Sequence, residues 1–273
     1  MGEWHNKGKM VFKATGLRAA KPEVCPPAET PSVSAWARAS LGLDFDPIQA
    51  EILDSPARRI VICATRQMGK SFLASIRILH QVLHAPGSLV IIASPGERQS
   101  GELFLKVRGL IAQLGLRTTG DGVNALALVF PNSSRLVALP ENPDCIRGFS
   151  GSALLVIDEA AFATDELYTA VLPFLARSEG TLWMISTPRG QSGLFYDVWH
   201  NPELSHWRRF RITAEDCPRI PRAFLDEMKL VNPAKYWQEY MCEFIAAPTQ
   251  IFDRELIDAS RDETYPPFFG DGR

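Results

Sequence analysis

The sequence predicts an α/β fold in which a mostly parallel sheet is flanked by helices. Three observations support this prediction. Apolar residues 60–63 precede a polar turn, and Gly69-Lys70-Ser71 then opens a segment with helical periodicity. A second apolar run, 154–157, ends in Asp158-Glu159, and strand-like and helix-like segments alternate between the two. This combination is typical of a P-loop NTPase of the RecA/ASCE type.

The turn before Lys70 has the features of a phosphate-binding loop. Unpaired backbone N–H groups at a helix N-terminus favour a phosphate, Lys70 can reach the terminal phosphates, and the Ser71 hydroxyl can ligate Mg²⁺. Ala64 stands where the usual motif has its first glycine. The residues that we expect to contact a nucleotide here are Thr65, Arg66, Gln67, Met68, Gly69, Lys70, Ser71 and Phe72.

Composition limits the class of protein. The chain has 273 residues, of which 46% are apolar, enough for one large domain with a small appendage. A net charge of −2 does not by itself indicate nucleic acid, so contact with a polyanion requires a local patch. The five cysteines lack C-x-x-C spacing, and no apolar run is long enough to cross a bilayer. We therefore expect a soluble cytoplasmic protein without structural zinc.

The segment before the first strand is expected to begin as a flexible arm. Residues 1–31 are rich in proline and lysine and lack apolar periodicity. Ser32 or Ser34 can cap a short helix, and Pro47 suits the first turn of the next. Gln49 can pair with an adenine edge through its amide, although a glutamine at such a position is more often simply on the surface.

The middle of the chain continues the alternation of strand and helix. Residues 89–94 predict a strand and 97–114 a long amphipathic helix, while 126–130 and 135–139 predict a β-hairpin at one end of the sheet. Asp158 follows its strand at the carboxyl edge of the sheet, where it can hold Mg²⁺, and Glu159 can orient the attacking water.

Further strands and helices follow the acidic pair. Residues 181–188 predict a buried strand, whose Ser186 and Thr187 either sense the γ-phosphate or merely end the strand. Residues 193–200 look helical, 207–212 resemble an edge strand, and 221–245 suggest two short helices. Their Trp237 and Tyr240 are expected in the core or in packing contacts.

The order of these motifs resembles one known family. Gln49, Arg66-Gln67-Met68-Gly69-Lys70-Ser71, residues 154–160, Ser186-Thr187-Pro188 and Trp237-Gln238-Glu239-Tyr240 occur as in the ATPase domain of the large terminase subunit. That subunit is the motor with which tailed bacteriophages package DNA into a preformed capsid. The resemblance runs from about residue 43 to 244, and the Arg-Gln pair typical of the family accounts for the absent glycine.

The resemblance implies a role for each motif. Gln49 is expected to contact adenine, Arg66 and Lys70 to contact phosphates, and Ser71 and Asp158 to hold Mg²⁺. Glu159 is expected to act on water, and residues 186–188 would couple hydrolysis to movement. The implied domains are a flexible arm at 1–31, an ATPase core at 32–194, a lid at 195–247 and a linker or tail at 248–273.

The resemblance also implies partners in the host cytoplasm. These are double-stranded DNA, the portal protein of the procapsid, the small terminase subunit and further copies in a ring, pentameric in this family. An arginine of one subunit completes its neighbour's site in such rings. Arg98, Arg108 and Arg147 are candidates for this finger or for a phosphate sensor within the subunit, and a surface position is the alternative for each. We expect the isolated chain to be a monomer and a slow ATPase.

One departure from the family concerns the nuclease domain that follows in full-length subunits. The acids after residue 244 are too close together for a two-metal site, so we do not expect this chain to cleave DNA; they are Asp253, Glu255, Asp258, Asp262 and Glu263. Two alternatives to a packaging motor stay open. One is a helicase-like DNA-remodelling ATPase, for which no second RecA-like domain is apparent. The other is a nucleotide-binding assembly module without turnover, against which Lys70, Ser71, Asp158 and Glu159 are all present.

Overall fold

A mixed sheet organises the part of the chain that the computed structural model describes, namely residues 30–140, 152–246 and Ser260. Its seven strands lie in the order β3-β4-β2-β5-β6-β1-β7. All neighbours are parallel except β3 and β4, which form an antiparallel hairpin at one edge. The strands are β1 (Arg59–Ala64), β2 (Leu89–Ser94), β3 (Ala127–Val129), β4 (Arg135–Pro140), β5 (Leu154–Asp158), β6 (Thr181–Ser186) and β7 (Arg208–Ile212).

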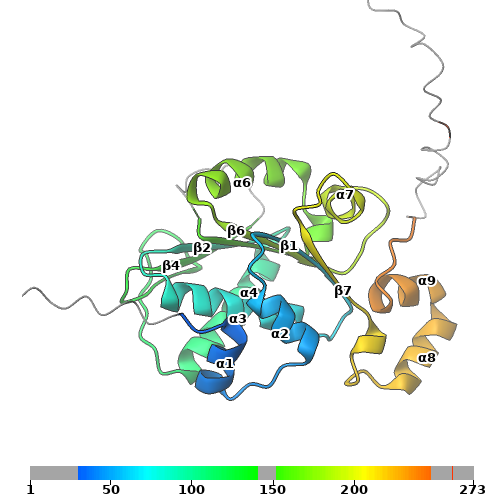
Figure 1. The fold of residues 1–273 in the computed structure, drawn as a ribbon, viewed down its shortest axis with the longest axis horizontal. Helices are drawn as coiled ribbons and strands as arrows, with labels where there is room; N and C mark the ends of the chain where they lie inside the picture. The colour runs from blue at the N-terminus through cyan, green and yellow to red at the C-terminus, as the bar shows by residue number, and fades with distance from the viewer. Residues whose placement is uncertain (1–29, 141–151, 247–259, 261–273) are drawn as a thin grey trace, which may run out of the picture. The chain divides into compact units, whose positions relative to one another are not determined.

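Helices cover both faces of this sheet (Figure 1). Helices α1 to α4 lie against one face, and α6 and α7 lie against the other. Helices α8 and α9 and a π-helix follow β7. The bounds are α1 (Val33–Leu41), α2 (Pro47–Asp54), α3 (Lys70–His84), α4 (Glu97–Gln113), α6 (Asp165–Ser178), α7 (Leu194–His200), α8 (Arg222–Val231), α9 (Pro233–Lys235) and the π-helix (Tyr236–Tyr240).

Local sequence signals account for the helix starts near the site. Ser32 caps α1 through its side chain, and Pro47 occupies the first turn of α2. Gly69 precedes α3 with φ +94°, a left-handed conformation that suits glycine. These starts confirm the predicted helix beginnings and place the N-terminus of α3 at the carboxyl end of β1.

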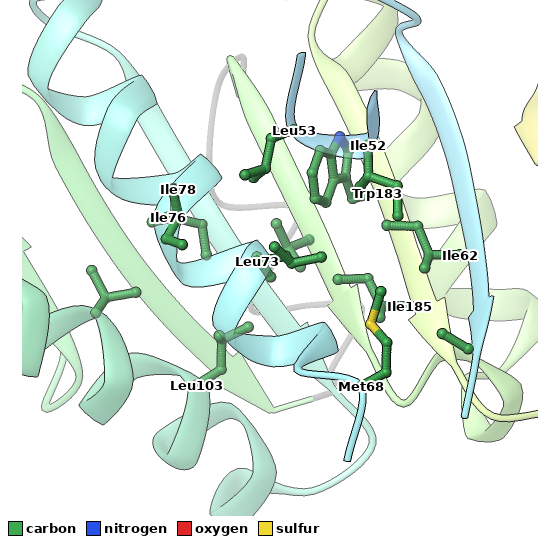
Figure 2. Packing of buried hydrophobic residues seen from close by; sticks show 14 of the residues in the cluster. Ile52, Leu53, Ile62, Met68, Leu73, Ile76, Ile78, Leu103, Trp183 and Ile185 are labelled. Atoms are coloured by element: carbon green, nitrogen blue, oxygen red, sulfur yellow. The ribbon is translucent and has the colours of Figure 1, made fainter. Parts of the chain in front are cut away.

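The core is divided by the sheet because successive residues of a strand point to opposite faces. In β6, Trp183 and Ile185 join the cluster under α1 to α4, whereas Leu182 and Met184 join the cluster under α6 and α7. Figure 2 shows Trp183 beside Ile52 and Ile62, with Leu73 of α3 over the same sheet face. The indole of Trp183 is fully buried, so this face holds the sheet and the loop-bearing helix together.

Most predicted strands and helices are confirmed, with one difference, because helix α6 was not expected. Trp237 is 41% exposed, and its ring packs against Tyr236, with ring centroids 5.4 Å apart, and lies 5.5 Å from the Lys229 ammonium. Of the two positions expected for Trp237, the packing contact is the one observed. Tyr240 is buried as predicted. Across the described ranges, no helix is both long and apolar enough to span a membrane.

Candidate active site

A cavity of about 390 Å³ opens at the carboxyl edge of the sheet, where the loop after β1 meets the ends of β5 and β6. Its volume is within the range of small-ligand sites. The strand order puts β6 between β1 and β5, so the ends of all three strands converge here. The lining residues are Arg66, Gln67, Gly69, Lys70, Ser71, Phe72, Lys106, Glu159 and Thr187.

The loop itself is shaped to receive an anion. Gln67 and Gly69 both have positive φ, 65° and 94°, which turns the loop tightly ahead of α3. The Lys70 ammonium donates to the carbonyl oxygens of Ala64 at 3.0 Å and Thr65 at 3.2 Å. Burial lowers the pKa of Lys70, and the charges of Glu159 and Asp158 partly oppose this. The ammonium therefore lies at the mouth of a helix N-terminus, the usual position for a phosphate ligand.

Gln49 lies behind the loop. Its Nε2 donates to the Met68 carbonyl at 3.3 Å, and its Oε1 accepts from the Asp46 backbone N–H at 3.1 Å. The side chain is buried and does not line the cavity. Both ends of the amide are thus in use within the chain, where they fix the start of α2 and brace the loop.

The acidic pair lies opposite the loop. Asp158 is buried at the end of β5, and Glu159, which lines the cavity, adopts a left-handed conformation with φ 54°. Burial and the neighbouring charge of Glu159 raise the pKa of Asp158. Ser186 Oγ donates to Glu159 Oε2 at 3.4 Å, and the adjacent Thr187 lines the cavity. A strained conformation at a carboxylate that faces a cavity is typical of a functional site.

The oxygen ligands present here suit Mg²⁺. Ser71 offers a hydroxyl and Asp158 a carboxylate, both hard oxygen donors of the kind that Mg²⁺ prefers. The charge of Glu159 adds to the effect of burial in raising the pKa of Asp158, and a divalent cation would relieve that repulsion. The described residues contain no cluster of three or more His, Cys, Asp or Glu side chains suited to a metal, so an ion here would need additional ligands from substrate or water.

Arg66 is held by a side chain that sequence reasoning did not assign. Its Nε lies 2.7 Å from Glu239 Oε2, and its terminal nitrogen donates to Glu239 Oε1 at 3.3 Å. The Arg66 backbone N–H also donates to the Glu239 carbonyl at 3.3 Å. The π-helix therefore joins the loop through three contacts to one residue, and the guanidinium stays at the edge of the cavity.

Two of the three arginines considered from the sequence are not brought to the cavity, and the third is not among the described residues. Arg98 and Arg108 are exposed on α4 and do not line it, and Arg147 lies outside the described residues. Lys106, between them in sequence, does line it. Thr65, Met68 and Ser186 are buried behind the lining. Lys106 and Glu239 are thus the side chains that sequence reasoning missed, and only tertiary packing brings them to the site.

With this geometry established, comparison with known proteins identifies the family. The sequence profile described as terminase large subunit, T4likevirus-type, N-terminal, matches residues 61–259. The chain belongs to this family. Over 219 residues this terminase chain is 28% identical to the terminase large subunit of Escherichia phage T5, in an alignment that covers 77% of the chain and 50% of that protein. The chain spans about half the length of the curated relatives it matches.

Solved structures agree with the family. The ATPase domain of the large terminase of Thermus phage P74-26 has a TM-score of 0.66 and 25% identity, over 76% of this terminase chain and 97% of that domain. A large terminase from a thermophilic bacteriophage, solved in complex with ATP-gamma-S, has a TM-score of 0.56 and 14% identity, over 78% and 51% of the two chains. The second likeness supports the fold alone. Together they confirm the predicted RecA/ASCE-like fold class.

Proposed function

We propose that this chain is the ATP-hydrolysing domain of a large terminase subunit and that its turnover drives double-stranded DNA into a procapsid. The observation that carries the proposal is the meeting of Lys70 and Ser71 with Asp158 and Glu159 around one cavity. Family membership supports the packaging role. ATP is the substrate, because the loop favours phosphate groups and the acidic pair lies where the terminal phosphate would end.

The residues act on the γ-phosphate in defined roles. Lys70 leaves its loop carbonyls for the phosphate oxygens, which offer a stronger, charge-assisted partner. Glu159, held by Ser186, orients a water for in-line attack. The bond from the water oxygen to γ-phosphorus forms while the bond from γ-phosphorus to the bridging oxygen breaks, which yields ADP and phosphate. Mg²⁺, held by Ser71 and Asp158, would neutralise phosphate charge.

We propose two roles for Gln49. Its present contacts make it a brace for the loop, through the Met68 carbonyl. Adenine recognition, implied by the family resemblance, requires the amide to exchange its bond to Asp46 for the base. The adenine role is supported if the unsubstituted chain prefers ATP over GTP and Gln49→Ala loses this preference while its melting temperature stays unchanged.

In our proposal the active site is completed in an assembled ring, where a neighbouring subunit contributes an arginine. We assign the portal protein, the small subunit and a ring of identical subunits as partners, in the cytoplasm of the host. An arginine from a neighbour, with Arg98, Arg108 and Arg147 as candidates, enters the site in trans.

The lid consists of the segment from about residue 214 to 244, because β7, within the lid expected at 195–247, is a strand of the main sheet. The arm at 1–31 and the tail at 248–273 fall almost wholly outside the described residues, and so do the acids on which the expected lack of nuclease activity rests.

Turnover as a function of protein concentration tests this proposal. Phosphate release per subunit should rise steeply as light scattering detects oligomers, because a trans arginine contributes roughly 10³ to 10⁵ in related systems. Mixing Glu159→Ala with a subunit that lacks the finger arginine should restore part of the activity. Nucleotide binding without any turnover, at every concentration and with DNA and portal present, would instead favour an assembly module.

A further inference from the structure

Lys106 is a cation of the cavity with no assigned role. It lies on α4 and lines the cavity together with Lys70 and Glu159. Its neighbours in the helix, Leu103 and Val107, are fully buried, so α4 is firmly seated while the Lys106 side chain stays outside the core. Figure 2 shows Leu103 at the end of α3 that carries the phosphate loop, next to Leu73. The packing of the two helices thus delivers Lys106 to the loop.

The three cations of the cavity differ in their partners. Arg66 is paired with Glu239, and Lys70 donates to two loop carbonyls. Lys106 makes no hydrogen bond or ion pair with any residue in the described ranges. Its ammonium keeps its three donors available at the lip of a cavity built for phosphate.

The position of Lys106 relates it to the acidic end of the cavity. It lines the same cavity as Glu159, the carboxylate proposed to orient water, and Thr187, which follows β6. Its ammonium therefore belongs to the cavity in which the γ-phosphate would end. Negative charge is spread over the γ-phosphate oxygens in the transition state, and a positioned cation there stabilises it.

We infer that Lys106 donates to γ-phosphate oxygens of a bound nucleoside triphosphate and so distinguishes ATP from ADP within its own subunit. This inference rests on the proposed ATPase function. It assigns to Lys106 the in-subunit sensor role for which Arg98, Arg108 and Arg147 were candidates, and it leaves the trans finger to an arginine. A phosphate of bound DNA is the competing partner for an exposed lysine, and the experiment separates the two.

The test compares Lys106→Ala, Lys106→Arg and the charge-matched Arg117→Ala in a Glu159→Gln background that holds ATP unhydrolysed. Arg117 is exposed beyond the end of α4 and does not line the cavity. Isothermal titration calorimetry with Mg²⁺ and no DNA gives the ATP and ADP affinities. Loss of one charge-assisted hydrogen bond should weaken ATP binding by Lys106→Ala about tenfold, with ADP affinity unchanged. Lys106→Arg should keep most of the ATP preference, and Arg117→Ala should keep all of it.

Three results would overturn the inference. Equal losses for ATP and ADP would place Lys106 away from the γ-phosphate. Unchanged nucleotide affinities combined with weaker binding of a DNA duplex would make Lys106 a DNA contact. Failure of the Glu159→Gln protein itself to bind ATP would reject the proposed function and this inference together. If the Glu159→Gln protein binds ATP normally and Lys106→Ala leaves the ratio of ATP affinity to ADP affinity unchanged, the inference alone is rejected.

Discussion

The ion pair between Arg66 and Glu239 predicts that Glu239→Gln binds ATP more tightly while the fold becomes less stable. In the proposed site Arg66 exchanges Glu239 for a phosphate, so we expect the ion pair to compete with the nucleotide. The pair has contacts of 2.7 and 3.3 Å, but the Arg66 side chain is 60% exposed. Solvent screening therefore limits the contribution of the ion pair to the free energy of unfolding to about 1 kcal/mol. Removing that competition should tighten ATP binding about fivefold and lower the free energy of unfolding by about 1 kcal/mol.

Titration of ATP and urea unfolding of the same samples measure both effects. Glu243→Gln is the matched control, because Glu243 lies in the same segment and pairs with Arg211 away from the cavity. The control should lose a similar amount of stability with no change in ATP affinity, and both differences should shrink at high salt. Weaker ATP binding by Glu239→Gln would refute the argument, since Glu239 would then be positioning Arg66 for the phosphate.

Three further predictions concern stability. Trp183→Ala should cost about 3–5 kcal/mol in chemical unfolding, whereas Trp183→Phe should cost less than about 1.5 kcal/mol because the buried indole N–H has no partner among the described residues. Gly180→Ala should lower stability by about 1–3 kcal/mol, since its Cβ would lie 2.0 Å from the Ser152 carbonyl oxygen, and an unchanged urea midpoint would contradict this. Burial and the neighbouring His84 lower the pKa of His80 to about 4. Because the unfolded pKa is near 6.5, stability should be full above pH 6.5 and fall as the pH drops toward about 4. His80→Gln should flatten this dependence in melting curves.

Much of the fold could be predicted because its signals are local. Buried parallel strands are continuous apolar runs, and the predicted limits of β2 match the observed Leu89–Ser94. Helix α6 could not be predicted in this way, because Pro173 lies in its interior and argues against a helix in the sequence. The sequence left open whether Trp237 lies in the core or in packing contacts, since helical spacing alone does not identify the face of a short helix that meets the core.

The candidate site divides in the same way. Asp158 and Glu159 were predicted because they lie at the end of β5, and Lys70 because it follows the loop after β1; parallel strands bring their carboxyl ends together. Glu239 reaches Arg66 across 173 residues of sequence, and Lys106 reaches the cavity through the packing of α4 beside α3. No spacing in the sequence encodes either contact. The assignment of Gln49 to adenine was based on the chemistry of its amide and on the family resemblance, and its contacts with Asp46 and Met68 appear only in the folded chain.

The central claim is that one cavity binds ATP through Lys70 and hydrolyses it through Glu159. The most direct measurement is a single-turnover phosphate-release assay on Glu159→Gln beside the unsubstituted chain, with ATP affinity recorded on the same preparations. The account predicts that Glu159→Gln retains ATP binding and loses at least about a hundredfold in the hydrolysis step, while Lys70→Ala loses binding itself. Hydrolysis by Glu159→Gln at the rate of the unsubstituted chain would contradict the account.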